Sequence, residues 1–186
     1  ELYPSHPGPS ETAELLLKQY NMNEQLEDLE RILLKAHQFA ADGLGEKHSR
    51  VADRCTDVAL LYRKMEAYQI ATEWQQKALD IKRADCEGES RPLDLGYAGT
   101  VNLLGEIHQE LGHFDLTEQL FTEALQIAIA NTQATVRRGE KNNLDHGNEG
   151  MLCVALVMTN LALLYREKGR IKIRPLPTMI PTEPGV

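Results

Sequence analysis

The chain has 186 residues and contains 20 Lys and Arg against 28 Asp and Glu, which gives a formal net charge of -8. Proteins that bind the phosphate backbone concentrate positive charge, so this acidic balance argues against a nucleic-acid partner. The hydrophobic content of 42% is ordinary for a folded protein, and the nearly pure apolar run at residues 151–158 is too short to span a bilayer, so we expect no transmembrane segment.

The three cysteines, Cys55, Cys86 and Cys153, are widely spaced and form no CxxC pair. A dispersed, odd-numbered set is typical of a reducing compartment, so we expect a cytoplasmic protein. The chain begins at Glu1 instead of Met. A targeting segment that has been removed, and with it an organellar (mitochondrial) location, therefore stays open as the alternative.

Apolar residues recur at helical spacing along most of the chain. Residues 1–10 are expected to form an extended arm, and residues 11–170 a helical domain that begins with a helix over residues 11–20. A second helix is expected from residue 23 or 24 to residue 39, and it would form a hairpin with the first. Two further hairpins and a seventh helix that ends at residues 168–169 are expected to follow. Residues 171–186 hold four of the eight prolines and are predicted to be a proline-rich tail.

A pattern of positions recurs within these segments. An aromatic or histidine residue marks the first helix of each unit, at Tyr20, Tyr62, His108 and Tyr165. Three residues earlier stands a mostly small residue that lets a neighbouring helix approach, at Leu17, Ala59, Gly105 and Ala162. Four residues later comes the expected turn, at Glu24, Glu66, Gly112 and Gly169. In the second helix of each hairpin an alanine recurs, at Ala36, Ala78 and Ala124.

This pattern resembles the tetratricopeptide repeat, a helix-turn-helix unit of about 34 residues. The segment Asn160-Leu-Ala-Leu-Leu-Tyr165 with Gly169 is similar to repeats of the kinesin light chain type, as is the linker Gly45-Glu-Lys-His48-Ser-Arg. The resemblance covers roughly residues 11–170. It implies an all-α, right-handed array of antiparallel helix pairs with about three and a half repeats. Leu17 is not small, and the last unit lacks its second helix.

In such an array the first helices of the units line a concave groove, where a protein or peptide partner would lie. A spacing of 3, 4 and 3 places one stripe of residues from each first helix in that groove. The candidate partner-binding residues are Asp53, Thr56, Leu60, Arg63, Asn102, Glu106, Gln109, Leu156, Thr159, Asn160, Leu163 and Arg166. Asn and Arg side chains would hold a peptide main chain or an acidic side chain. An ordinary solvated helix face is the alternative for each of them.

We expect no enzyme, no cofactor and no metal, because no motif with catalytic or metal-ligand spacing occurs. His108 and His113 lie five residues apart and are expected to point to different faces. A cluster in the last loop and helix start could in principle bind zinc, but capping residues explain it equally well; it comprises Asp145, His146, Glu149 and Cys153.

The expected function is therefore that of a protein-binding adaptor. The alternative is a structural accessory subunit that is packed permanently into a larger complex, with an organelle as one location of that complex. A polar groove combined with an apolar end would favour the subunit. The last helix is apolar over more than one face, so we expect a second copy or a different protein to cover the C-terminal end and produce a homo- or hetero-oligomer.

Overall fold

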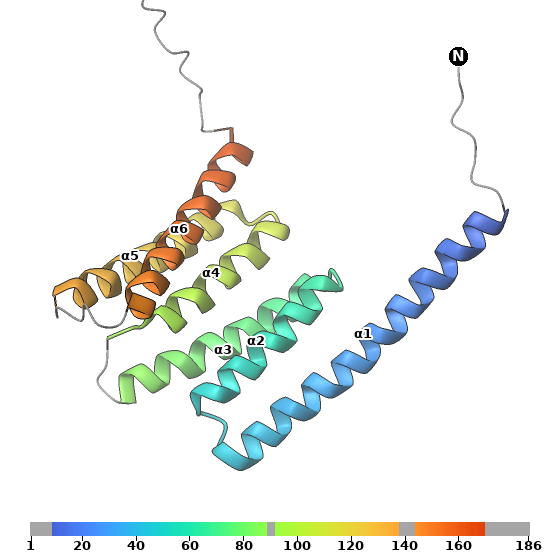
Figure 1. Ribbon diagram of the computed structural model, residues 1–186, viewed down its shortest axis with the longest axis horizontal. Helices are drawn as coiled ribbons and strands as arrows, with labels where there is room; N and C mark the ends of the chain where they lie inside the picture. Colours follow the sequence, from blue (N-terminus) through green and yellow to red (C-terminus); the bar gives the residue numbers. More distant parts are fainter. Residues whose placement is uncertain (1–8, 89–91, 138–143, 170–186) are drawn as a thin grey trace, which may run out of the picture.

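The computed structural model describes residues 9–88, 92–137 and 144–169, and its described side chains are those of residues 24–88, 92–135 and 149–169 (Figure 1). In these residues all regular structure is helical. The helices are α1 (Pro9–Leu44), α2 (Ser49–Lys64), α3 (Tyr68–Gly88), α4 (Leu95–Glu110), α5 (Phe114–Arg137) and α6 (Leu144–Glu167). Each helix packs against the next, so that α1 and α6 lie at opposite ends of the row. This arrangement confirms the predicted all-α repeat fold. Residues 1–8 of the predicted arm (residues 1–10) and the whole predicted tail (residues 171–186) lie outside the described residues. Pro9 and Ser10, which the sequence places in the arm, already belong to α1.

The prediction of a helical hairpin at the start of the chain is wrong. Helix α1 is continuous from Pro9 to Leu44 and has no turn at Glu24. The turns that do form use a left-handed residue, with φ of 76° at Gly112 and 59° at Glu66. Residues 20–25 contain neither glycine nor proline, so nothing there terminates the helix. The described residues therefore form six helices instead of seven, with two complete hairpins, α2–α3 and α4–α5, between α1 and α6.

Two hydrophobic clusters hold the hairpins together. One joins α2 to α3 through Val51, Ala52, Cys55, Ala78 and Ile81. The larger cluster runs from α3 to α6 and comprises Leu79, Tyr97, Val101, Leu104, Phe121, Ala124, Val157 and Leu164. Because each cluster is shared by neighbouring helices, successive units are bound into one row.

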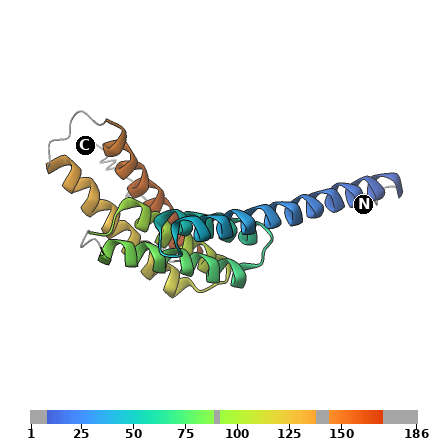
Figure 2. The same cartoon turned by 90° about the horizontal axis from the view of Figure 1, so that it is seen from below.

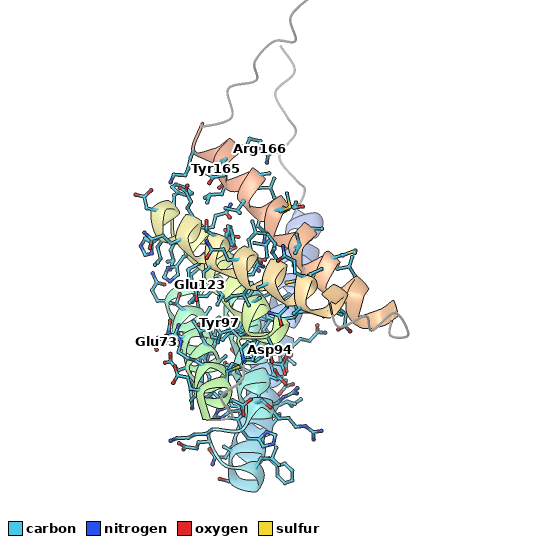
Figure 3. All side chains as sticks on the ribbon, turned by 90° about the vertical axis from the view of Figure 1, so that its left-hand side faces the viewer. Glu73, Asp94, Tyr97, Glu123, Tyr165 and Arg166 are labelled. Atoms are coloured by element: carbon cyan, nitrogen blue, oxygen red, sulfur yellow. The ribbon has the colours of Figure 1, made fainter. Side chains whose placement is uncertain are left out.

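Polar contacts between helices add to this packing. The buried Gln75 amide of α3 donates to the Thr100 carbonyl oxygen of α4 at 2.9 Å. Tyr97 is fully buried, and its hydroxyl accepts a 2.6 Å hydrogen bond from Arg83 and donates a longer one, of 3.4 Å, to Glu123. Figure 3 shows Tyr97 and Glu123 in the middle of the body, between α4 and α5. Such bonds fix the relative register of helices that apolar packing alone would leave free to slide.

Helix α1 is held at one end of the row by its C-terminal half. The Tyr62 hydroxyl of α2 donates to Glu30 at 2.5 Å, and the nearly buried His37 ring meets Trp74 of α3 edge to face at 5.1 Å. Lys77 lies 3.4 Å from the Nε2 atom of His37. The N-terminal part of α1 extends beyond the body (Figure 2).

Candidate interaction surfaces

The predicted groove residues of α2 and α4 are joined by an ion pair. The Arg63 Nη1 atom lies 2.6 Å from Glu106 Oε2, with side chains 30% and 23% exposed, and Arg63 also lies 3.7 Å from Glu110. The guanidinium group that we expected to hold a partner therefore has an acidic partner within the chain. An ion pair of this exposure contributes little to stability, about 0–1 kcal/mol, but it fixes where both side chains point.

The network continues from α4 to α6 through two asparagines. Asn160 donates to Asn102 Oδ1 and to Glu106 Oε1, each at 3.0 Å, and Asn102 donates to the same Glu106 oxygen at 2.8 Å. Asn102 is only 3% exposed. The structure therefore brings these predicted site residues together, in a polar network that joins the first helices of successive units.

Other residues of the predicted set are also engaged within the chain. Gln109 donates to Glu167 at 2.7 Å, and Asp53 forms an ion pair with Lys82 at 3.1 Å. The Thr56 hydroxyl oxygen is buried and has no hydrogen-bond partner among the described residues. The members of the set that present apolar surface to solvent are Leu60, Leu156 and Leu163, and Thr159 and Arg166 are exposed beside the last two. Figure 3 shows Arg166 near the C-terminal end of α6.

Helix α6 exposes a broad apolar surface at the end of the row. Met151 is 60% exposed, Leu152 68% and Met158 56%. The sequence predicts an apolar helix here that needs a cover, and no described part of the chain covers this face. Residues Glu149–Glu167 also have a mean hydropathy of 1.3, long and apolar enough for a membrane span by length and composition alone. The expectation that no such segment exists is thus not confirmed.

The tyrosine that recurs in the first helices, at Tyr62 and Tyr165, forms a hydrogen bond to a neighbouring helix. Tyr62 of α2 donates to Glu30 of α1, and Tyr165 of α6 donates to Glu118 of α5 at 3.0 Å. In α2 and α6 this tyrosine thus reaches an acidic residue of the preceding helix. The bond to Glu30 is the main reason why the pKa of Tyr62 is raised to about 12.

At the corresponding place in α4 the structure corrects a prediction about two histidines. His108 and His113 do not point to different faces; their Nδ1 atoms lie 3.1 Å apart. The helix ends at Glu110 and turns at Gly112, so His113 no longer follows the helical rotation on which the expectation was based. Burial, and then the neighbouring His113, lower the pKa of His108.

Among the side chains that the structure describes, no group of three or more His, Cys, Asp or Glu residues is arranged to hold a metal ion. The zinc alternative from the sequence includes Asp145 and His146, whose side chains lie outside the described part. Burial raises the pKa of the Cys153 thiol, which disfavours the thiolate that a metal would need.

Comparison with known proteins gives one finding. Residues 51–84 match the tetratricopeptide repeat family, and this segment covers α2 and most of α3, the first complete hairpin. No curated protein matches the chain. The matched hairpin, its second copy in α4–α5 and the packing of each helix on the next together support a tetratricopeptide-type repeat protein.

Proposed function

We propose that this chain is a non-catalytic protein-interaction module, and that it binds a helix of a partner protein on the exposed side of α6. Tetratricopeptide repeats generally mediate contacts between proteins and act as scaffolds without catalysis. The observation that carries the proposal is a set of positions in α6 that are exposed although the corresponding positions of α2 and α4 are buried.

These positions follow from the register of the repeats. Matching Tyr62 with His108 and Tyr165 aligns three further positions along the three first helices. In α2 and α4 all six residues are buried, namely Ala52, Cys55, Ala59, Ala98, Val101 and Gly105. Their counterparts in α6 are exposed, namely Ala155, Met158 and Ala162. A surface that is covered by α3 in one unit and by α5 in the next is thus not covered in α6 by any described helix, and apolar surface of this kind is stabilised by a covering helix.

The two covering helices indicate what the partner helix looks like. Three fully buried residues in each of α3 and α5 follow the same spacing of four and then three. They are Ala71, Gln75 and Ala78 in α3 and Thr117, Phe121 and Ala124 in α5. Small residues stand first and third, and a larger one stands between them. We therefore propose an amphipathic partner helix that carries this small, large, small pattern.

A second copy of this chain fits the surface less well. Its α1 helix also exposes an apolar stripe, at Leu29, Ile32 and Phe39, but Leu29 is large where Ala71 and Thr117 are small. Within the chain, Arg63 of α2 lies near Glu110 of α4. In the repeat register Arg166 corresponds to Arg63, and Lys64 corresponds to Glu110. If copies stacked end to end, Arg166 of one copy would therefore lie opposite Lys64 of the next. Like charges at that contact favour a different protein as the occupant.

The experiment compares two arginine substitutions in the full chain. Ala162→Arg places a charge on the proposed docking surface, and Ala84→Arg adds the same charge at an exposed position of α3. We expect a partner that copurifies in fixed stoichiometry with the unchanged chain and with Ala84→Arg to be lost with Ala162→Arg. Cross-links from the partner should map to α6. A partner retained by Ala162→Arg, or self-association of the purified chain that Ala162→Arg abolishes, would contradict the proposal.

Binding of a partner segment in the groove is a second candidate, because Leu60, Leu156 and Leu163 expose apolar surface there. Leu60→Arg lies on this face and away from α6, so it separates the two candidates. Loss of the partner with Leu60→Arg but not with Ala162→Arg would favour the groove. Loss with Ala162→Arg alone would favour the end surface, the arrangement expected of a permanently packed subunit.

A further inference from the structure

The turn between α4 and α5 brings two histidine side chains together on the surface. His113 donates its backbone N–H to the His108 carbonyl oxygen at 2.9 Å, and Gly112 donates to the Gln109 carbonyl oxygen at 2.9 Å, with φ of 76° at Gly112. These two bonds around a left-handed glycine form a Schellman motif, in which the first residue of the last turn and the second residue beyond the helix come side by side. The motif therefore holds both histidines by backbone hydrogen bonds.

The other units of the chain lack this pair. The same backbone bonds form at the end of α2, where Ala67 donates to the Tyr62 carbonyl oxygen at 2.9 Å, but the side chains there are Tyr and Ala. In α3, Thr72 stands where α1 and α5 have Glu30 and Glu118, and its hydroxyl donates to Tyr68 of its own helix. Among the described residues, no carboxylate of the preceding helix thus bonds to His108 in the way that Glu30 bonds to Tyr62.

The distance between the two Nδ1 atoms matches the distance between two nitrogen ligands of one metal ion. The Nδ1 atoms are 3.1 Å apart and the ring centroids 5.4 Å apart, with 36° between the ring planes. Two imidazole nitrogens at about 2.0–2.1 Å from one metal ion, in a tetrahedral or square arrangement, are themselves separated by about 2.8–3.4 Å. His113 is exposed and His108 is half-buried, so an ion can approach from solvent.

We propose that His108 and His113 form a binding site for one divalent transition-metal ion, each through its Nδ1 atom. Imidazole ligands suit Cu²⁺, Ni²⁺ and Zn²⁺, and Cu²⁺ binds such a site most tightly of the three. Two protein ligands leave the other coordination positions of the ion to water. The backbone bonds hold the two residues side by side, so less conformational freedom is lost on binding than for two histidines at independent surface positions.

The test is calorimetric titration of the full, chelator-treated chain with Cu²⁺, Ni²⁺ and Zn²⁺ in a buffer that does not bind metals. The variants are His108→Tyr and His113→Ala, because Tyr62 and Ala67 occupy these places in the first hairpin and the fold accepts them there. His48→Asn is the matched control, since it removes an exposed histidine and keeps a side-chain acceptor at the start of α2. Circular dichroism checks that each variant is folded.

We expect one ion per chain, the order Cu²⁺ tighter than Ni²⁺ and Zn²⁺, and a loss of affinity of at least about tenfold in each single variant but not in the control. Nitrogen-15 spectra with Zn²⁺ should show shifts at both Nδ1 atoms. Undiminished binding in His108→Tyr and His113→Ala would mean that the ion sits adventitiously elsewhere. An equal loss of affinity in His48→Asn, or no binding of metal by the unchanged chain, would also contradict the proposal.

Discussion

Gly105 allows α4 and α5 to approach closely. A Cβ atom at this position would lie 2.6 Å from Cε1 and 2.8 Å from Cδ1 of the Phe121 ring, which is fully buried and therefore has little room to move. Gly99, in the same helix, has no such neighbour within 4 Å. The two glycines differ in packing but share a helical backbone, so they separate the effect of space from the effect of helix propensity.

We predict that Gly105→Ala destabilises the chain by about 1–3 kcal/mol, because the methyl group overpacks the core and outweighs the gain of about 1 kcal/mol in helix propensity. Gly99→Ala should be neutral or stabilising by up to about 1 kcal/mol. Urea unfolding followed by circular dichroism measures both changes. Equal midpoints for the two variants would show that the core relaxes around position 105, contrary to this account.

At this scale the sequence predicted some contacts and not others. Small residues at Ala59 and Gly105 follow from the repeat pattern, and both are buried as expected. Spacing alone does not predict the meeting of His108 and His113, because five residues along one continuous helix would point the two side chains to different faces. Gly112 predicts a turn, and a Schellman geometry at that turn is the signal that places the two rings together.

At the scale of elements, α1 differs most from expectation. Its first half repeats the apolar spacing of a first helix, but the turn position is held by Glu24 among residues that continue a helix readily. Glu66 adopts the left-handed conformation that costs a non-glycine residue about 1–2 kcal/mol, and the buried α2–α3 cluster offsets that cost. A turn at Glu24 would need a comparable core between the two halves of α1. Local spacing alone could not reveal its absence.

The contact between α1 and α3 should depend on pH through His37. Burial, and then the positive charge of Lys77, lower the pKa of His37 below its usual value of 6.5, while Glu46 acts weakly in the opposite direction. Above pH 6.5 the ring is neutral in both the folded and the unfolded chain, and the contact has its full stability. As the pH falls below 6.5 the unfolded chain takes up the proton first, so folding stability declines until the pH passes the lower pKa of the folded state.

Trp74 is the only tryptophan of the chain and reports on this contact directly. We predict that acidification from pH 8 to pH 5 lowers the urea midpoint of the unchanged chain, as followed by Trp74 emission, more than that of His37→Gln. The variant keeps a polar side chain but cannot titrate. The difference between the two chains isolates His37 from the other histidines. An identical pH dependence in both would show that protonation of His37 leaves the docking of α1 unaffected.

At the scale of the whole molecule, the polar network along α2, α4 and α6 is what the groove prediction could not foresee. Sequence spacing predicts that Arg63, Asn102 and Asn160 lie on one side of the array, and in the structure all three bond to Glu106. It could not tell whether these groups await a ligand or bind one another, because that depends on distances between helices. Because these polar groups bond to one another, the exposed apolar side of α6 is the stronger candidate for a docking surface.

Since each helix of a repeat array contacts mainly its neighbours, a change at the α4–α6 contact should weaken one end of the molecule before the other. Asn102→Ala removes a buried amide that accepts from Asn160 and donates to Glu106, which should cost about 1–3 kcal/mol. Gln109→Ala breaks the bond to Glu167, which joins the same two helices in an exposed place and should cost about 1 kcal/mol or less.

Amide hydrogen exchange distinguishes these cases helix by helix. We predict that Asn102→Ala lowers the protection of α6 clearly more than that of α2 and α3, and that Gln109→Ala has a smaller effect with the same bias toward α6. The α2–α3 hairpin should keep its protection because its own core, around Val51 and Cys55, does not include Asn102. A uniform loss across α2 to α6 would instead mean that the array opens as one cooperative unit, in which the exposed end formed by α6 has no independent stability.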